Sequence, residues 1–177
     1  EDCLRKRPSY DIARAPYLYD GALMTAIHEL KYAQKTHLAD SLGSLLASFA
    51  QTWIGKLKGS LVMPVPLHPR RLRARGFNQS LLLARCVASK TCADLDFLSL
   101  RRTRFTKPQT ELSSEERKKN VRKAFEVVKP GRVKGRTIVL VDDVATTGST
   151  LNECAKALRR AGAEEVLCLV LARTSTA

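Results

Sequence analysis

The chain lacks the features of metal-finger, secreted and membrane proteins. Its five cysteines include no Cys-x-x-Cys pair and its three histidines are scattered, so we expect no zinc site in this sequence. The odd number of cysteines and the absence of a signal-like segment favour a reducing cytoplasm. No apolar run approaches the roughly 20 residues that span a bilayer. We therefore expect a cytoplasmic protein with no membrane span.

Acidic residues are also few. Asp and Glu number 17 against 31 Lys and Arg, which gives a formal net charge of +14 and a pI near 10.0. This excess predicts a polyanionic partner or a highly anionic ligand. A solvated surface is the alternative, but one of two basic clusters contains only arginine, whose planar fork matches phosphate oxygens. That cluster is Arg70, Arg71, Arg73 and Arg75, and the second is Arg101, Arg102, Arg104, Lys107, Arg117, Lys118, Lys119, Arg122 and Lys123.

The apolar residues that are present suffice for one domain. With 177 residues, 44% of them hydrophobic, the chain is long enough for one well-buried core and too short for two ordinary domains. We assign residues 1–60 to a helical N-terminal part and residues 61–177 to a ligand-binding core. Helical spacing covers residues 20–31, 38–53 and 80–91, and apolar runs predict strands over residues 61–66, 97–102 and 165–172.

The most informative stretch begins at a short apolar run, residues 137–141. Its β-branched composition predicts a buried parallel strand, which places Asp142 and Asp143 at the edge where open α/β sheets bind ligands. Apolar residues then recur at helical spacing from Leu151 to Leu158, with Gly162 as the C-terminal cap. The hydroxyl-rich turn of residues 146–150 therefore lies at a helix N-terminus.

A turn of this kind suits a phosphate, because free amides, the positive end of the helix dipole and hydroxyl groups converge there. The two carboxylates can accept hydrogen bonds from ribose hydroxyls or hold a hard divalent cation. The alternative is a pair that only caps the helix. A phospho-receiver domain fits poorly, since its acidic pair lies on the first strand, and the Gly-x-x-x-x-Gly-Lys-Ser/Thr motif of P-loop enzymes is absent.

Several segments resemble one known family. Residues 139–151 resemble the phosphoribosyl-pyrophosphate (PRPP) motif of type I phosphoribosyltransferases, in which the acidic pair contacts the ribose hydroxyls and the following loop wraps the 5-phosphate. Further segments are similar to the ComF/GntX family, and together they cover about residues 20 to 174. These segments are Leu30–Tyr32, Val62–His68, Arg75–Gln79 and the series Gln109, Arg117, Asn120, Ala124 and Phe125.

The resemblance implies an α/β fold of the Rossmann-like type I phosphoribosyltransferase kind, with a mostly parallel sheet, flanking helices and a small N-terminal helical hood. It also implies a role in natural competence, the uptake of transforming DNA, with competence proteins as candidate partners, or in nucleotide salvage. Members of the family generally begin with a Cys-rich zinc finger, and here the chain departs. Cys3 is either the last ligand of such a finger or an isolated residue. The other cysteines, Cys86, Cys92, Cys154 and Cys168, lie in apolar patterns that predict core positions.

The resemblance also implies roles for individual residues. Asp142, Asp143 and Lys107 are the catalytic candidates, and the acidic pair also holds Mg²⁺, directly or through the ligand. Pro64 and Pro66 predict a rigid turn in the pyrophosphate loop, with Arg70 to Arg75 close by. The PRPP-binding candidates are Asp142, Asp143, Ala145, Thr146, Thr147, Gly148, Ser149 and Thr150, and the pyrophosphate-binding candidates are Pro66, Leu67, Arg71 and Arg75.

Two classes of function remain open from the sequence. The first is an enzyme that transfers the pentosyl group of PRPP to a nucleobase or another amine, or that degrades PRPP. The second is a single-stranded DNA-binding or regulatory competence protein without transferase turnover. Candidates for substrate or DNA contact are Phe77, Asn78, Gln79, Arg104 and Phe105. For Phe77, packing at the start of a helix explains the residue as well as contact with a base does. For Asn78, capping of that helix explains it as well as contact with a substrate does.

Overall fold

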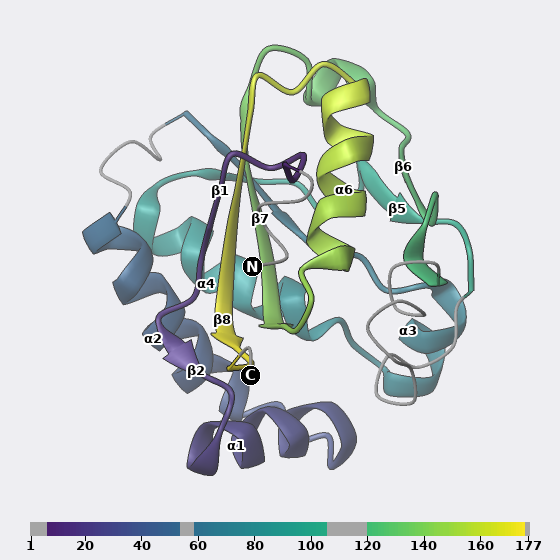
Figure 1. The fold of residues 1–177 in the computed structure, drawn as a ribbon. Coiled ribbons are helices and arrows are strands. Elements are labelled where there is room, and N and C mark those ends of the chain that lie inside the picture. Colours follow the sequence, from purple (N-terminus) through teal and green to yellow (C-terminus); the bar gives the residue numbers. More distant parts are fainter. Residues whose placement is uncertain (1–6, 54–58, 106–119, 176–177) are drawn as a thin grey trace.

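A mostly parallel sheet lies at the centre of the computed structural model, which describes residues 7–53, 59–105 and 120–175 (Figure 1). The strand order is β1-β8-β7-β3-β4, and β2 pairs with β8 beyond the end of β1. All these pairings are parallel. The strands are β1 (Ile12–Arg14), β2 (Tyr17–Leu18), β3 (Leu61–Pro64), β4 (Asp94–Leu95), β7 (Thr137–Ala145) and β8 (Glu165–Arg173).

Helices cover both faces of this sheet, so its central strands are apolar on both sides. Alternate residues of β7 enter different cores: Val139 and Val141 pack with three helices on one face, and Ile138 and Leu140 pack against α6 on the other. A separate antiparallel pair, β5 and β6, adds to the second face. The remaining elements are α1 (Gly21–Tyr32), α2 (Leu38–Trp53), α3 (Pro69–Arg75), α4 (Gln79–Thr91), β5 (Leu100–Arg102), β6 (Phe125–Val127), the 3₁₀ turn η3 (Pro130–Arg132) and α6 (Ser149–Arg160).

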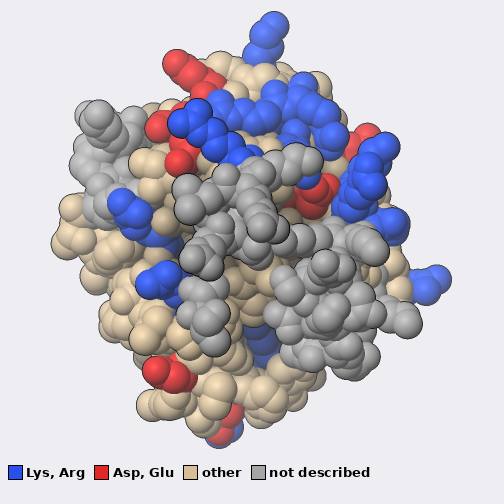
Figure 2. Space-filling model, viewed as in Figure 1, with Lys and Arg blue, Asp and Glu red and all other residues tan. Residues whose placement is uncertain are grey.

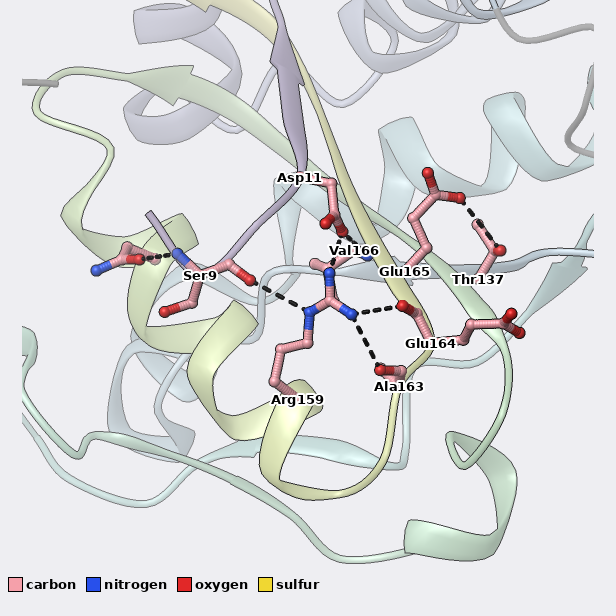
Figure 3. Close-up of polar contacts among 9 residues, drawn as sticks. Ser9, Asp11, Thr137, Arg159, Ala163, Glu164, Glu165 and Val166 are labelled. Atoms are coloured by element: carbon pink, nitrogen blue, oxygen red, sulfur yellow. Dashed lines mark hydrogen bonds and ion pairs between the residues drawn. The ribbon is translucent and has the colours of Figure 1, made fainter. Parts of the chain in front are cut away.

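The N-terminal segment is fastened to α6 and β8 (Figure 3). The Ser9 amide donates to Asn152 Oδ1 at 2.7 Å, and Asp11 forms an ion pair with Arg159. Asp11 Oδ2 also accepts from the amide of Val166 at 2.7 Å. These contacts hold the segment beside the turn that opens α6, at the start of the edge strand β1.

The fold class predicted from the sequence is confirmed: the structure is α/β with a mostly parallel sheet and flanking helices. Helix α2 has the predicted bounds, and α1 and α4 differ from theirs by about one residue. None of the helices in the described ranges is long and apolar enough to cross a membrane.

Several local predictions were wrong. The N-terminal part is not wholly helical, because it also contributes β1 and β2. The arginine cluster does not follow directly on a strand but forms its own helix, α3, which begins at Pro69. The strand predicted over residues 97–102 starts only at Leu100. Cys92 is exposed at the end of α4 rather than in the core.

Candidate functional site

The candidate site lies at the C-terminal edge of β3 and β7. Because these strands are parallel and Pro64 pairs with Val141, both chains leave the sheet on the same side. The Val65 amide donates to the carbonyl of Val141 at 2.9 Å. The loop that contains Pro66 and Leu67 therefore begins next to Asp142.

Asp142 is buried and already hydrogen-bonded. Its Oδ1 accepts from the Ser80 hydroxyl at 2.8 Å and from the amide of Asp143 at 3.0 Å. Ser80 is in the first turn of α4, where the Asn78 side chain accepts from its amide at 3.1 Å. Burial, and then the neighbouring charge of Asp143, raise the pKa of Asp142 to about 7. A sugar hydroxyl that donates to this carboxylate would stabilise its charged form.

Asp143 has a different partner. Its Oδ2 forms an ion pair with Nζ of Lys31, the second-last residue of α1, and its Oδ1 accepts from the Val144 amide at 2.9 Å. Burial lowers the pKa of Lys31, but the Asp143 carboxylate outweighs this effect and raises that pKa overall. The two carboxylates, expected to act as one cradle, are thus adjacent but turned toward different helices. Lys31 connects them, because its charge also acts on Asp142.

The turn after β7 has the geometry of an anion site. Gly148 has φ 67°, in the left-handed region, and precedes the first residue of α6. The Thr147 and Ser149 hydroxyls hydrogen-bond to each other at 2.7 Å. The amides of Thr146 and Gly148 make no hydrogen bond to other described residues, so they remain available to a phosphate. A Cβ added to Gly148 would lie 3.4 Å from the Tyr10 hydroxyl, which places the N-terminal segment against this turn.

Arginines stand on the other side of the site. Arg75 Nη1 donates to Gln79 Oε1 at 2.7 Å, and its guanidinium lies 5.5 Å from the Tyr32 ring centroid. Arg71 is half-buried, and burial and the neighbouring Arg75 lower its pKa. Arg102, only 6% exposed, has its pKa lowered to about 10, first by burial and then by Arg71. Crowded guanidinium groups of this kind favour an anion that joins them.

The ring of Phe105 stands among these cations. Arg70 and Arg71 lie 5.5 Å and 5.9 Å from its centroid, and the imidazole of His68 meets it edge-on at 5.2 Å. Phe105 is 49% exposed. Its neighbour Arg104, also exposed, donates to the carbonyl of Asn120 at 2.7 Å. Phe105 therefore offers a cation-flanked aromatic surface to solvent.

Other predicted residues have structural roles. Asn78 caps α4 and its Nδ2 donates to the Val65 carbonyl at 3.1 Å, which ties that helix to the pyrophosphate loop. Gln79 is buried and receives Arg75, and Phe77 packs against the core. Lys107 lies outside the described residues, as do Gln109 and the basic residues Arg117, Lys118 and Lys119.

Three residues at the site were missed at the level of sequence. Lys31, Ser80 and Arg102 each come from a different element and approach the acidic pair from a distance along the chain. Lys31 had a signal, since it stands within the family-like segment Leu30–Tyr32. For Ser80, the sequence indicated only a position at the start of a helix. Nothing in the sequence distinguished Arg102 from the other basic residues of its cluster.

The described residues offer few ligands for a divalent cation at this site. Among the described residues no group of three or more His, Cys, Asp or Glu side chains converges on a point that could hold a metal ion. The acidic pair alone supplies two carboxylates, and Lys31 already pairs with one of them. These residues fit Mg²⁺ only together with oxygens that a phosphorylated ligand brings.

The chain is similar to known proteins over most of its length. The family model described as phosphoribosyl transferase domain matches residues 78–176. The chain is 38% identical over 175 residues to DNA utilization protein YhgH of Escherichia coli (strain K12), covering 97% of this chain and 76% of that protein. It is 34% identical over 179 residues to Competence protein F of Haemophilus influenzae, covering 97% and 77%.

The fold also occurs among solved structures. The structure of the allosteric regulatory enzyme of purine biosynthesis aligns with 75% of this chain and 26% of its own, at 24% identity and a TM-score of 0.51. At this level of identity the match concerns the fold.

Proposed function

Because the chain belongs to the ComF family of proteins with a phosphoribosyltransferase fold, we propose that it binds PRPP together with Mg²⁺ and uses this ligand in DNA uptake or nucleotide salvage. The 5-phosphate would lie at the turn of residues 146–150, the ribose hydroxyls at Asp142 and Asp143, and the pyrophosphate toward Arg71 and Arg75. Names of the relatives refer to DNA utilization and competence, which supports the cellular role.

One observation carries the proposal. The acidic pair on β7, the phosphate turn after it and the loop after β3 open on the same edge of the sheet. PRPP carries a phosphate at one end, a diol in the middle and a pyrophosphate at the other end. Its binding requires a phosphate site, a carboxylate pair and a pyrophosphate site side by side. Arg71 and Arg102 add the positive charge that a pyrophosphate neutralises.

Mg²⁺ enters this proposal with the ligand. Oxygens of the pyrophosphate and ribose complete a coordination shell that the protein does not provide alone, and the acidic pair contributes through hydrogen bonds or at most one carboxylate oxygen. In a transfer reaction, the bond from ribose C1 to pyrophosphate breaks as an acceptor amine forms a bond to C1. The fold's task would be to hold the sugar and neutralise the leaving group.

The test is calorimetric titration with PRPP, with and without Mg²⁺. We expect binding by the natural chain and a loss of affinity of about 100-fold in Asp142→Asn/Asp143→Asn, because hydrogen bonds to charged groups are worth roughly 1.5 to 3 kcal/mol each. The matched control is Asp94→Asn, an exposed carboxylate at the opposite edge of the sheet. Equal heats from all three proteins would refute the site.

A second candidate function is single-stranded DNA binding, and the aromatic and arginine side chains of the site favour it. Exposed rings of Tyr32 and Phe105 each lie beside an arginine, at 5.5 Å from Arg75 and 5.5 Å from Arg70. Bases stack on aromatic rings without regard to sequence, while arginines follow the phosphates. The same edge would then receive a polynucleotide as well as a sugar phosphate.

A salt titration of oligo(dT) binding separates the two candidates. A plot of log affinity against log salt with a slope of several units indicates several phosphate contacts, at about 0.7 units each for a single strand. Arg70→Gln/Phe105→Leu should weaken binding, whereas Lys129→Gln, an exposed cation near the opposite edge, should change it little. No binding near physiological salt would exclude a DNA site.

A further inference from the structure

We propose that Lys31 is the resident counter-ion of Asp142 and Asp143, and that it reserves these carboxylates for neutral sugar hydroxyls by keeping a bare divalent cation away. The part that concerns sugar rests on the proposed function. The part that concerns cations is a property of the protein without any ligand, and it can be tested alone.

The contact itself is built into the fold. Lys31 is placed by α1, whose buried residues Ile27 and Leu30 anchor the helix in the core. Its side chain is 17% exposed and that of Asp143 only 6%, so the ion pair is largely withdrawn from water. A buried carboxylate without a partner is costly, and the cost falls when a cation is held against it. Lys31 supplies that cation permanently.

Three of the four oxygens of the acidic pair already have partners. Asp142 Oδ1 accepts from Ser80 and from a backbone amide, and Asp143 Oδ1 accepts from the amide of Val144. Asp143 Oδ2 is taken by Lys31. A divalent cation would have to displace the ammonium group or bind beside it, and like charges a few ångström apart repel strongly at low dielectric.

A hydroxyl group meets no such barrier. It carries no charge, it can donate to a carboxylate oxygen, and its own oxygen can accept one of the three N–H groups of an ammonium. A hydroxyl of a vicinal diol can therefore donate to the acidic pair without displacing the ammonium group of Lys31. The arrangement selects a sugar over a free metal ion at this position.

The same helix turn reaches the pyrophosphate side of the site. Tyr32, next to Lys31, lies under the guanidinium of Arg75, which in turn is bonded to Gln79. The last turn of α1 therefore contacts the acidic pair and α3 at once. Lys31 makes the contact with the acidic pair, and Tyr32 makes the contact with α3.

The experiment measures Mn²⁺ binding to the ligand-free protein by electron paramagnetic resonance, with Mn²⁺ as the probe of a divalent site. We expect the natural chain to leave Mn²⁺ free, and Lys31→Met to bind it at least about tenfold more tightly, because a positive charge near the carboxylates has been removed. Lys31→Arg keeps the charge and should exclude Mn²⁺ like the natural chain. Lys31→Met/Asp143→Asn should lose the gained site.

Thermal melts show which variants are folded. If Lys31→Met does not melt cooperatively, Lys31→Gln replaces it, because glutamine retains a hydrogen-bond donor toward Asp143. Mn²⁺ binding to the natural chain as tight as to the neutral variants Lys31→Met and Lys31→Gln would overturn the proposal. Since no sugar phosphate is present, either result is independent of whether the protein binds PRPP.

Discussion

Asp142 holds a carboxylate where water has little access. Burial and the charge of Asp143 raise its pKa from 3.8 to about 7, so the folded chain retains a proton that the unfolded chain has lost. Between these two values the folded state binds more protons, and its stability therefore falls as the pH rises. At neutral pH the carboxylate thus lowers the stability of the protein in which it is proposed to bind ribose.

The prediction concerns Asp142→Asn, which removes the ionisable group and keeps an oxygen that can accept from Ser80. At pH 8 the variant should be more stable than the natural chain by about 1 to 4 kcal/mol. Near pH 4 the advantage should nearly vanish. Urea unfolding at both pH values measures it, with Asp94→Asn as the exposed control. An advantage that is the same at both pH values would contradict the assigned pKa.

The sequence predicted those site residues that lie close together along the chain. Asp142, Asp143 and Gly148 form one short stretch, so a strand followed by a helix is enough to place them. Lys31 and Ser80 were missed because their contacts with the pair depend on how α1 and α4 pack on the sheet. Local patterns do not contain that information.

The turn that joins β7 to α6 depends on one backbone conformation. Gly148 adopts φ 67°, and a Cβ there would meet the Tyr10 hydroxyl at 3.4 Å. A side chain in the left-handed region costs roughly 1 to 2 kcal/mol. The element is therefore sensitive to a single methyl group.

We predict that Gly148→Ala lowers the free energy of unfolding by about 1 kcal/mol and weakens binding of ribose 5-phosphate. The first effect follows from backbone strain and the second from displaced amides at the turn. Chemical denaturation and calorimetry measure them. Gly131→Ala is the control, because Gly131 has no positive φ and open space around its Cβ position. Equal effects in both variants would show that the turn tolerates a side chain.

Elements were predictable where their pattern was long. The periodic run of α2 and the apolar run of β8 were assigned correctly. Strand β7 begins where predicted but continues through Asp142 and Asp143 to Ala145, because β8 pairs with it along this whole length. Helix α3 was not predicted; Pro69 is its first residue, where a missing amide proton is harmless. Pro64 is tolerated in β3 because β4 pairs only with Leu61 and Val62. Strands β1 and β2 are too short to show an alternating hydrophobic pattern. They are strands because their backbones pair with β8.

The whole molecule carries a large positive charge, and the described surface distributes it unevenly. Figure 2 shows Lys and Arg gathered over the upper part of one face, where the loops that enter β7 and β8 lie in Figure 1. The loop before β7 contains Lys129, Arg132, Lys134 and Arg136. Positive charge therefore occurs at both edges of the sheet, beyond what one sugar phosphate requires.

A net charge of +14 should destabilise the folded state at low ionic strength through self-repulsion. We predict that raising NaCl from about 20 to 300 mM increases the melting temperature by a few degrees, because the Debye length shortens from roughly 20 Å to below 10 Å. Differential scanning calorimetry measures the change. Lys129→Glu/Arg160→Glu lowers the net charge and should show a smaller increase; a melting temperature that falls with salt would contradict the prediction.

Family and fold class both followed from sequence, because they depend on motifs and on the order of elements. The sequence did not predict that basic residues would lie at both ends of the parallel strands. The positions of charged residues along the chain do not indicate which end of the sheet they reach after folding.

The pairing of β1 with β8 has a consequence for synthesis on the ribosome. Ile12 is translated 155 residues before Leu167, its partner in the sheet. Strand β1 therefore stays unpaired until β8 has been translated, and the ion pair between Asp11 and Arg159 forms only after α6 has emerged. Slow codons or early termination between β7 and β8 would leave a nascent chain with an open sheet edge, a target for chaperones and proteases.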